Sequence, residues 1–379
     1  MVLQMLASLS YSDDNISTPA PPLINLKIVE TVGNPSSIRD DWMNKLINGD
    51  NLAVLTALLS DDSVCGKVRL IYIDPPFSTG QLFNQKHTNE IAYDDTLQGP
   101  AFLNFLKKRL FLLKELLADD GSIYVHIDTK IGHYVKILMD EVFGQDRFVN
   151  DITRIKCNPK NFERKAYGNY KDMILFYSKT SNYIWNDSRE EMTKEEIERL
   201  FPKIDKDGRH YTTTPLHAPG ITQKGPTGNL WKGMYPPKSR HWRYSPNELS
   251  RLDSEGLIEW SKTGNPRLKI YADDAVKNGK KRQDIWEFKD PPYPDYPTEK
   301  NLEMLKVIIN TSSNKNDIVL DAFCGSGSTL HASQLLERKW IGIDASPIAI
   351  KTARQRLMHV PCYFNVYDAE VKTMCEYNH

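Results

Sequence analysis

The sequence has few of the residues that mark a secreted, metal-binding or membrane protein. Its five cysteines are widely spaced and include no CxxC pair, which argues against a disulfide framework or a zinc site. Its nine histidines include no HExxH motif, so no metal is expected. No run reaches the roughly 18 apolar residues that a membrane helix needs. These absences predict a cytoplasmic protein that has no metal centre and no membrane span.

The net charge is zero, but the charges are unevenly distributed. Residues 151–290 carry 27 basic and 20 acidic side chains, and the rest of the chain carries 22 basic and 29 acidic ones. A basic middle segment on an acidic body is typical of a protein that binds a polyanion. Surface charge also varies this much in proteins that bind no polyanion, so the basic surplus alone does not establish that this chain binds one.

An acidic, proline-rich loop follows a predicted buried strand. The apolar run 68–73 predicts the strand, and Asp74-Pro75-Pro76-Phe77 comes directly after it. The prolines fix φ and remove two backbone donors, which leaves a stiff loop rich in acceptors. Such a loop suits a planar ring with an exocyclic amino group. The ring would stack on Phe77, and its NH₂ would donate to Asp74 and to the Pro75 carbonyl.

The same kind of motif occurs a second time, as Asp290-Pro291-Pro292-Tyr293. Polar residues precede this copy and further prolines follow it, so we expect no strand to lead into it. We interpret it as a proline-rich connector. Substitution of Asp290 should therefore leave the chemistry largely intact, whereas substitution of Asp74 should abolish it.

Residues 316–346 predict a βαβ unit. A strand at 317–323, a tight turn at 324–329, a helix at 330–337 and a second strand at 340–344 follow one another. Glycines in the turn let a ligand approach the backbone, and Asp344 can accept from two ribose hydroxyls. The third glycine of a dinucleotide fingerprint and the lysine of a phosphate-binding loop are both missing. This favours a nucleoside ligand without phosphates, such as S-adenosylmethionine.

In this combination the chain resembles the β-class S-adenosylmethionine-dependent DNA amino-methyltransferases, from about Trp42 to about Met358. The catalytic motif at 74–77 comes first, the basic segment second and the cofactor motif at 321–327 last, which is the β-class order. The resemblance implies methylation of the N6 amino group of a flipped-out adenine in double-stranded DNA. It also implies an α/β fold, a Rossmann-like, doubly wound, mostly parallel sheet in the circularly permuted order of class I methyltransferases.

The resemblance divides the chain and assigns residues to sites. We expect a flexible leader at 1–40, a catalytic domain at 41–180 and 291–379, and an inserted target-recognition region at 181–290. The expected catalytic residues are Asp74, Pro75, Pro76 and Phe77. The expected cofactor contacts are Asp50, Thr298, Lys300, Asp321, Phe323, Cys324, Gly325, Ser326, Gly327 and Asp344. The expected DNA contacts are Lys232, Lys238, Arg240, Trp242, Arg243, Lys280, Lys281 and Arg282.

Several of these residues also have ordinary structural interpretations. Asp50 is a good helix N-cap, and a lysine such as Lys300 is often a solvated residue at a helix start. Trp231 and Trp242 are as readily explained as anchors of a small core. His126 and Asp128, on a strand predicted at 122–128, are expected to be structural or to line the pocket.

Alternatives remain open at the level of the sequence. The leading Asp favours adenine N6, but cytosine N4 methylation uses the same kind of loop. Methylation of RNA or of a protein amide, and a DNA-recognition subunit of a restriction complex, are functions of other classes. The target sequence, a cognate restriction endonuclease and a homodimer cannot be inferred from these patterns.

Overall fold

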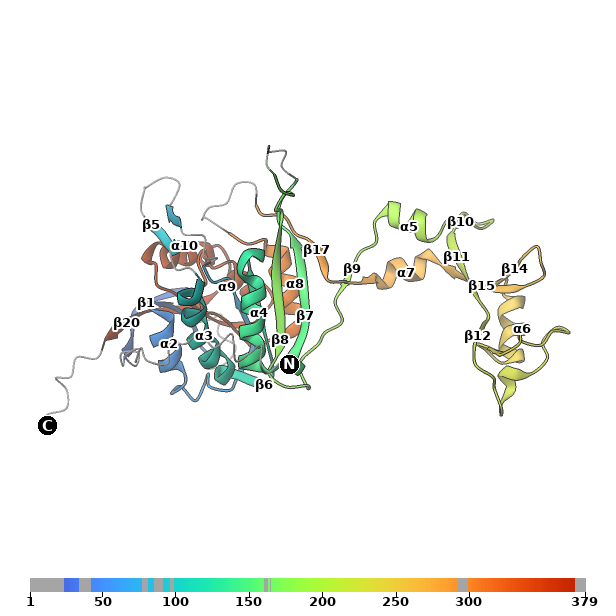
Figure 1. The fold of residues 1–379 in the computed structure, drawn as a ribbon, viewed down its shortest axis with the longest axis horizontal. Coiled ribbons are helices and arrows are strands. Elements are labelled where there is room, and N and C mark those ends of the chain that lie inside the picture. The colour runs from blue at the N-terminus through green and yellow to red at the C-terminus, as the bar shows by residue number, and fades with distance from the viewer. Residues whose placement is uncertain are drawn as a thin grey trace. The chain divides into compact units, whose positions relative to one another are not determined.

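The computed structural model describes residues 24–33, 42–76, 81–84, 91–95, 99–159, 163, 165–291 and 299–371, with only the backbone described at 81–84 and 91–95. The chain divides into two compact units, one formed by residues 1–187 with 283–379 and the other by residues 188–282 (Figure 1). The second unit falls inside the recognition region that the sequence predicts at 181–290.

A ten-stranded sheet forms the centre of the first unit, in the order β1-β20-β2-β19-β18-β3-β6-β8-β7-β17. The six strands from β20 to β6 are parallel neighbours. β1 and β8 run antiparallel to their neighbours. The bounds are β1 (Ile24–Gly33), β2 (Asn44–Asn48), β3 (Val68–Ile73), β6 (Leu117–Ile127), β7 (Phe148–Ile155), β8 (Lys171–Ser178), β17 (Ile285–Glu287), β18 (Ile318–Asp321), β19 (Lys339–Asp344) and β20 (Tyr363–Val371). This is the mostly parallel α/β sheet that the sequence predicts.

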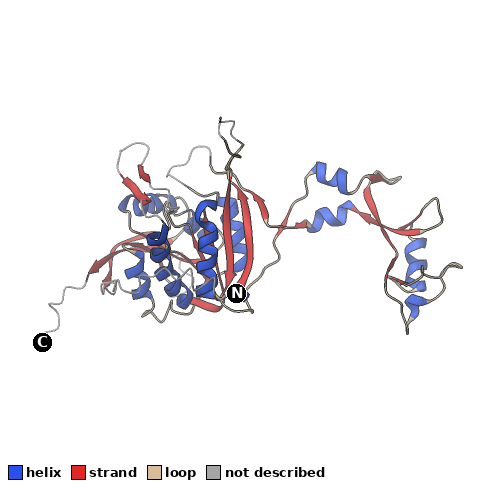
Figure 2. Cartoon of the chain, viewed as in Figure 1, coloured by secondary structure: helices blue, strands red, loops and turns tan. Residues whose placement is uncertain are grey.

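Helices cover both faces of this sheet (Figure 2). Successive side chains of a strand point to opposite faces, and β3 shows it: Ile71 and Ile73 pack on one side, Leu70 and Tyr72 on the other. The first side is covered by α2 (Asn51–Leu58), α3 (Gly99–Leu116) and α4 (Thr129–Phe143). The second is covered by α8 (Leu302–Ser312), α9 (Ser328–Leu335) and α10 (Pro347–Leu357). β4 (Gln81–Asn84) and β5 (Ile91–Asp95) form a separate antiparallel pair.

Two elements differ from the sequence-based expectation. Residues 24–33, assigned to a flexible leader, form β1, which pairs antiparallel with β20. Its alternation of Ile24 and Leu26 with polar residues suits an edge strand, and both pack against the core. The expectation that no strand precedes Asp290 was also wrong. β17 pairs in parallel with β7, and because it is three residues long and buries only Trp286, its pattern is too short to recognise.

The second unit is built around a tryptophan-rich core. Trp231 and Trp242 pack with Leu216, Leu249 and Leu268. A four-stranded sheet has the order β10-β11-β15-β14, and β12 pairs with β13 and β9 with β16. The bounds are β9 (Arg189–Glu190), α5 (Lys194–Leu200), β10 (Lys203–Ile204), β11 (His210–Pro215), β12 (His217–Pro219), β13 (Arg240–Trp242), α6 (Pro246–Ser254), β14 (Ile258–Trp260), β15 (Pro266–Tyr271), α7 (Ala272–Asn278) and β16 (Lys280–Lys281).

Candidate active site

Four acidic residues lie where adjacent parallel strands end. β3 ends just before Asp74, β18 at Asp321 and β19 at Asp344, while Asp50 follows β2. These strands are neighbours in the order β2-β19-β18-β3, so their carboxyl ends share one edge of the sheet. Ligands of open α/β sheets bind outside this edge. The structure therefore places the two motifs that the sequence singled out, the Asp74 loop and the glycine turn, on adjacent strands.

The Asp74 loop carries a carboxylate with one occupied and one vacant oxygen. Asp74 Oδ2 lies 2.5 Å from Nζ of Lys300, and the two side chains are only 15% and 9% exposed. Asp74 Oδ1 is buried and accepts no hydrogen bond from the described residues. Leaving a buried acceptor unpaired costs about 1–3 kcal/mol, so this oxygen is suited to a donor supplied by a ligand. Pro75 is buried and Pro76 is half-buried. Phe77 lies outside the described residues.

The glycine turn after β18 is fixed by backbone hydrogen bonds. Asp321 accepts from the amide of Phe323 (3.0 Å), and the amide of Cys324 donates to the carbonyl of Ile343 on β19. Gly327 has φ +76°, and a Cβ there would lie 2.8 Å from the Cβ of Ala353 on α10. Only glycine combines this conformation with such a close helix approach. The turn therefore leads directly into α9.

The carboxylates of this turn are largely shielded from water. Burial raises the pKa of Asp321 to about 7, and the nearby charges of Asp74 and Asp344 add to the effect. Asp344 accepts from the amides of Gly325 and Ser346, both at 2.9 Å, while burial raises its pKa. Each carboxylate oxygen has two lone pairs, so Asp344 retains capacity for the ribose contact that the sequence suggests.

Asp50 combines a cap with an ion pair. Its side chain accepts from the amide of Ala53 at the start of α2, and its Oδ2 lies 3.0 Å from Nη2 of Arg109 on α3. Arg109 also donates to Asn51, whose own amide donates to the carbonyl of Ala322 (2.7 Å). These bonds tie α2 and α3 to the end of β18. Sequence reasoning missed Asn51 and Arg109.

A sequence signal for Arg109 did exist. It lies four residues after Phe105 and three after Leu106, hence on the apolar face of the predicted helix, where a cation is out of place. Its side chain is 5% exposed, and burial lowers its pKa to about 10. A cation at a core position indicates a nearby acidic partner, which here is Asp50, whose own side chain is 61% exposed.

Lys300 belongs to a segment held on both sides. Its neighbour Glu299 lies 2.7 Å from Nη2 of Arg356 on α10, and Arg356 also donates to the hydroxyl of Ser328 at the start of α9. Lys300, which the resemblance assigns to the cofactor, pairs in the structure with Asp74. Thr298 lies outside the described residues.

A buried row of polar side chains crosses the sheet beside the Asp74 loop. Tyr72, two residues before Asp74, lies 2.8 Å from Nδ1 of His126, whose Nε2 lies 3.1 Å from Asp172. Burial lowers the pKa of His126, which favours the neutral ring. Its Nε2–H donates to Asp172, so Nδ1 accepts from the Tyr72 hydroxyl. His126 thus has a structural role, as Asp128 does in capping α4.

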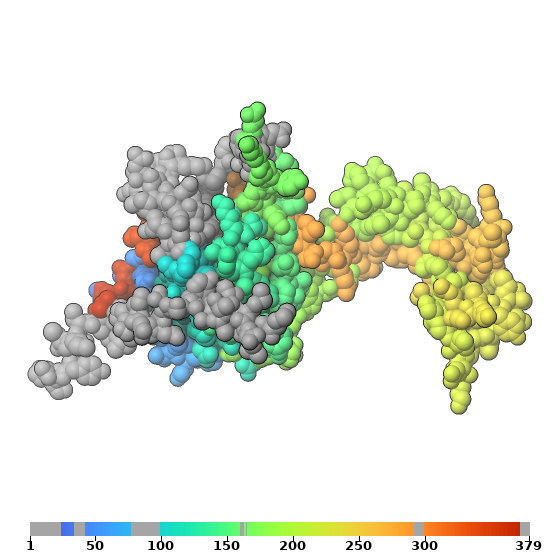
Figure 3. Space-filling model, viewed as in Figure 1, coloured from blue at the N-terminus to red at the C-terminus, as the bar shows by residue number. Residues whose placement is uncertain are grey.

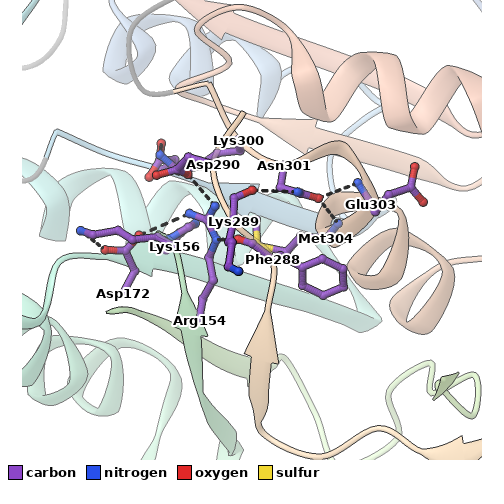
Figure 4. Close-up of polar contacts among 12 residues, drawn as sticks. Arg154, Lys156, Asp172, Phe288, Lys289, Asp290, Lys300, Asn301, Glu303 and Met304 are labelled. Carbon is purple, nitrogen blue, oxygen red and sulfur yellow. Dashed lines mark hydrogen bonds and ion pairs between the residues drawn. The ribbon is translucent and has the colours of Figure 1, made fainter. Parts of the chain in front are cut away.

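The row continues to the second Asp-Pro-Pro motif. Arg154, which is fully buried, contacts Asp172 at 3.4 Å and Asp290 at 2.5 Å (Figure 4). Lys156 contacts the other oxygen of Asp172 at 2.6 Å. Hydrogen bonds from His126 and from Lys156 hold the pKa of Asp172 well below its usual range, against the effect of burial. Asp290 is therefore more than part of a connector, because it is the carboxylate partner of a buried cation.

The residues that the sequence suggests for DNA contact fall into two groups. Lys238, Arg240 and Arg243 are exposed. Other members have structural partners: Lys232 is paired with Asp253, Lys280 with Glu190 and Glu196, and Arg282 with Glu190. Lys281 lies on β16 opposite Arg189. Trp242 is 2% exposed and donates to the carbonyl of Asn229, so we withdraw it from the expected DNA contacts.

Two kinds of feature are absent from the residues that the structure describes. These residues contain no group of three or more His, Cys, Asp or Glu side chains that could hold a metal ion. None of their helices is both long and apolar enough to cross a membrane.

Comparison with known proteins gives consistent matches. The family model described as DNA methylase (N6_N4_Mtase) matches residues 68–355. Type II methyltransferase M.EcaI from Enterobacter cloacae is 47% identical over 319 residues, which are 83% of this chain and 69% of that protein. The Mod subunit of the type III enzyme StyLTI from Salmonella typhimurium is 27% identical over 78% of this chain, which spans 50% of that subunit. A solved structure of an M1.HpyAVI–SAM complex matches 83% of this chain and 100% of its own with a TM-score of 0.44 and 17% identity.

Proposed function

Because the chain belongs to the DNA methylase family N6_N4_Mtase, we propose that it transfers a methyl group from S-adenosylmethionine to the N6 amino group of adenine in double-stranded DNA. One observation carries the proposal. Asp74 presents a buried oxygen without a hydrogen-bond donor at the edge of the sheet where ligands bind. An exocyclic amino group supplies the donor that this oxygen lacks.

The chemistry requires that the amino group be made nucleophilic. The lone pair of an exocyclic amine is delocalised into the ring, so the amine is a poor nucleophile. If its two N–H groups donate to Asp74 Oδ1 and to the Pro75 carbonyl, a tetrahedral nitrogen is favoured and the lone pair is released for attack on a methyl group. As the N–C bond forms, the bond from that methyl carbon to its sulfonium sulfur would break, with the sulfur keeping the electron pair. The nitrogen would then release one N–H proton to solvent. Most of the acceleration then comes from positioning and preorganised electrostatics. The amino nitrogen cannot be reached inside the duplex, so the base must be flipped out.

Lys300 fixes the orientation of the catalytic carboxylate in this scheme. It holds Oδ2 of Asp74 at 2.5 Å, so that Oδ1 remains for the base. A charge-assisted bond of this kind is shorter and stronger than a neutral one. The loop can therefore present its acceptor without first reorganising.

The residues at the glycine turn fit S-adenosylmethionine, which would supply the methyl group on a sulfonium. Asp344 would accept from the ribose hydroxyls, and the turn from Phe323 to Gly327 would let the ligand approach the backbone. Asp321, which is buried, and Asp344, which is half-buried, lie at an edge that carries several acids. Such an edge favours a positively charged ligand over a nucleotide phosphate. Asp50 and Lys300 would complete the pocket.

The nature of the methylated base is tested directly by mass spectrometry. DNA treated with the protein and S-adenosylmethionine should yield 6-methyladenine nucleosides, and Asp74→Ala should yield none. 4-Methylcytosine without 6-methyladenine would refute the adenine assignment. Methylation of RNA or protein in place of DNA would refute the substrate class. If the chain were only a recognition subunit, Asp74→Ala would leave its biological effect unchanged.

We propose that DNA is contacted by a basic ribbon of the second unit, namely β12, β13 and the loop between them. Residues 208–247 contain no Asp or Glu but six Lys or Arg, and this segment contributes much of the surface coloured from yellow-green to yellow in Figure 3. Two of the six cations, Arg209 and Lys232, are paired with Asp273 and Asp253. In the part of the chain that the structure describes, the other four have no carboxylate partner: Lys224, Lys238, Arg240 and Arg243.

These four exposed cations suit phosphates, and a two-stranded ribbon is narrow enough to enter a major groove. Tyr235, which is 71% exposed on the same loop, offers a flat face to a base. Replacing Arg240 and Arg243 together by alanine should weaken DNA binding and lower the slope of log K against log salt by about 2. Arg209→Ala is the matched control, because its cation is already neutralised. An equal loss in the control would contradict the assignment.

We also propose a restriction–modification context, since M.EcaI is named a type II methyltransferase and StyLTI Mod a restriction-modification subunit. Plasmid DNA from cells that express the chain should then resist an endonuclease that cuts at the methylated sequence. A cognate endonuclease and a homodimer remain proposals that sequencing of the neighbouring genes and sedimentation would test.

A further inference from the structure

The second Asp-Pro-Pro motif is attached to the sheet by three contacts. The Arg154 side chain reaches it twice, because Nη2 lies 2.5 Å from Asp290 Oδ1 and Nε donates to the carbonyl of Phe288 (2.8 Å). The backbone amide of Asp290 donates to the carbonyl of Lys156, the residue directly after β7 (2.7 Å). Figure 4 shows these groups together. Residues 288–290 are therefore held against β7 through both backbone and side chain.

Arg154 is a fixed point for this attachment. Its side chain is 1% exposed, and Nη1 contacts Asp172, which in turn contacts Lys156 and His126. A guanidinium that has hydrogen-bond partners on several sides has little freedom to rotate. Asp290, whose side chain is 46% exposed, is the outermost member of this group.

The segment that starts at Asp290 ends at Lys300. Asn301 caps α8 by accepting from the amides of Glu303 and Met304, and its Nδ2 donates to the carbonyl of Lys289 (2.8 Å). This bond joins the two ends of the segment. The Asp290 contacts thus fix the place from which Lys300 extends to Asp74.

We infer that the Arg154–Asp290 ion pair is a positioning anchor, which holds Lys300 against the catalytic carboxylate. The inference rests on the proposed function of Asp74. Neither Arg154 nor Asp290 needs to touch a substrate. Without the anchor, the start of the segment loses one of its attachments to the sheet, and Lys300 loses part of its alignment. Because displacements of about 1 Å can cost up to a hundredfold in rate, a weakened anchor should slow methyl transfer without abolishing it.

Asp290→Asn tests the anchor, since it removes the charge and keeps the size of a half-exposed side chain. Single-turnover transfer of tritiated methyl groups to DNA, at saturating S-adenosylmethionine and DNA, should slow by about tenfold. The dissociation constants for both ligands should change less than about threefold, and Asp290→Glu should restore most of the rate. Glu287→Gln is the control, because it removes an exposed carboxylate from β17 that pairs with the half-exposed Lys289. Unchanged single-turnover transfer in Asp290→Asn would overturn the anchor.

A double-variant cycle separates positioning through Lys300 from a general structural effect. If the anchor acts through Lys300, Asp290→Asn should slow Lys300→Met no further, so the two effects are not additive. Fully additive losses would overturn the inference. So would a loss of ligand affinity as large as the loss of rate.

A second readout does not depend on methyl transfer. Lys300 is largely buried, so acetic anhydride should acetylate it slowly, as peptide mass spectrometry reports. Asp290→Asn should accelerate acetylation of Lys300 severalfold, whereas Glu287→Gln should not. Unchanged labelling would overturn the anchor. If the native chain transferred no methyl group to any DNA, the proposed function would fail, but the labelling would still decide whether the anchor exists.

Discussion

We expect that the Asp74–Lys300 pair, which activity requires, lowers the free energy of unfolding of the protein. A buried oxygen of Asp74 accepts no hydrogen bond from the described part of the chain, and such an unpaired acceptor costs about 1–3 kcal/mol in the free protein. Replacing a buried ion pair by apolar side chains of similar volume is neutral or stabilising by about 1–4 kcal/mol. These two effects overlap and are not summed. For Asp74→Leu combined with Lys300→Met, we expect a free energy of unfolding about 1–3 kcal/mol higher than in the native chain.

The same double variant should be inactive. It removes the acceptor and the cation that orients it, and loss of a single preorganised group of this kind already costs about 10²–10³ in rate. The assays are thermal unfolding of the first unit, followed with the cofactor absent, and incorporation of tritiated methyl groups into DNA. A more stable and inactive protein would show that the strain lies at the catalytic loop.

An exposed ion pair provides the matched control. Lys107→Met with Glu141→Leu replaces a pair on α3 and α4 whose side chains are 36% and 52% exposed. Exposed pairs contribute little, so neither stability nor transfer should change appreciably. The reasoning is refuted if the Asp74/Lys300 variant is destabilised by more than about 2 kcal/mol, or if it keeps a tenth of the native transfer rate.

Three further outcomes are expected. Gly327→Ala should weaken S-adenosylmethionine binding in calorimetry and lower the unfolding temperature, because its Cβ would lie 2.8 Å from the Cβ of Ala353. Gly66→Ala is the control, because Gly66 has φ +68° but open space around it, so this variant bears only the conformational cost. Burial raises the pKa of Asp321 to about 7, so the folded chain holds a proton that the unfolded chain has lost; stability should fall as pH rises from about 4 to 7, and Asp321→Asn should flatten that slope. Trp242→Ala should destabilise the second unit by about 3–5 kcal/mol, and DNA binding lost without destabilisation would contradict its core role.

The parts of the site that could be predicted from the sequence have local causes. The strand before Asp74 is a continuous apolar run, and the prolines after it stop any ladder from continuing. The turn from Cys324 to Gly327 is recognisable because its glycines stand between two apolar runs. The four strand-end acids are then brought together by the parallel topology alone, since adjacent parallel strands end at the same edge.

The parts that could not be predicted depend on pairing between distant segments. Lys300 was assigned to the cofactor because of its neighbours in the chain, but its partner Asp74 lies in another element. Charge counting treated Lys280 and Arg282 as free to meet phosphates, although carboxylates of α5 and β9 neutralise them. Composition gives the surplus of charge, and only the fold shows which cations remain unpaired.

The two Asp-Pro-Pro motifs show how partners, more than sequence letters, decide what an acid can do. Each carboxylate has a buried cation on one of its oxygens, Lys300 for Asp74 and Arg154 for Asp290. The two motifs differ in the surroundings of the other carboxylate oxygen and in the strand that precedes the motif. Asp74 follows a largely buried central strand and keeps a buried oxygen that no described residue donates to, whereas Asp290 follows a short edge strand and is half exposed to water. Water can satisfy the second oxygen of Asp290, whereas among the described residues the buried oxygen of Asp74 has no donor, so a bound ligand is suited to supply one.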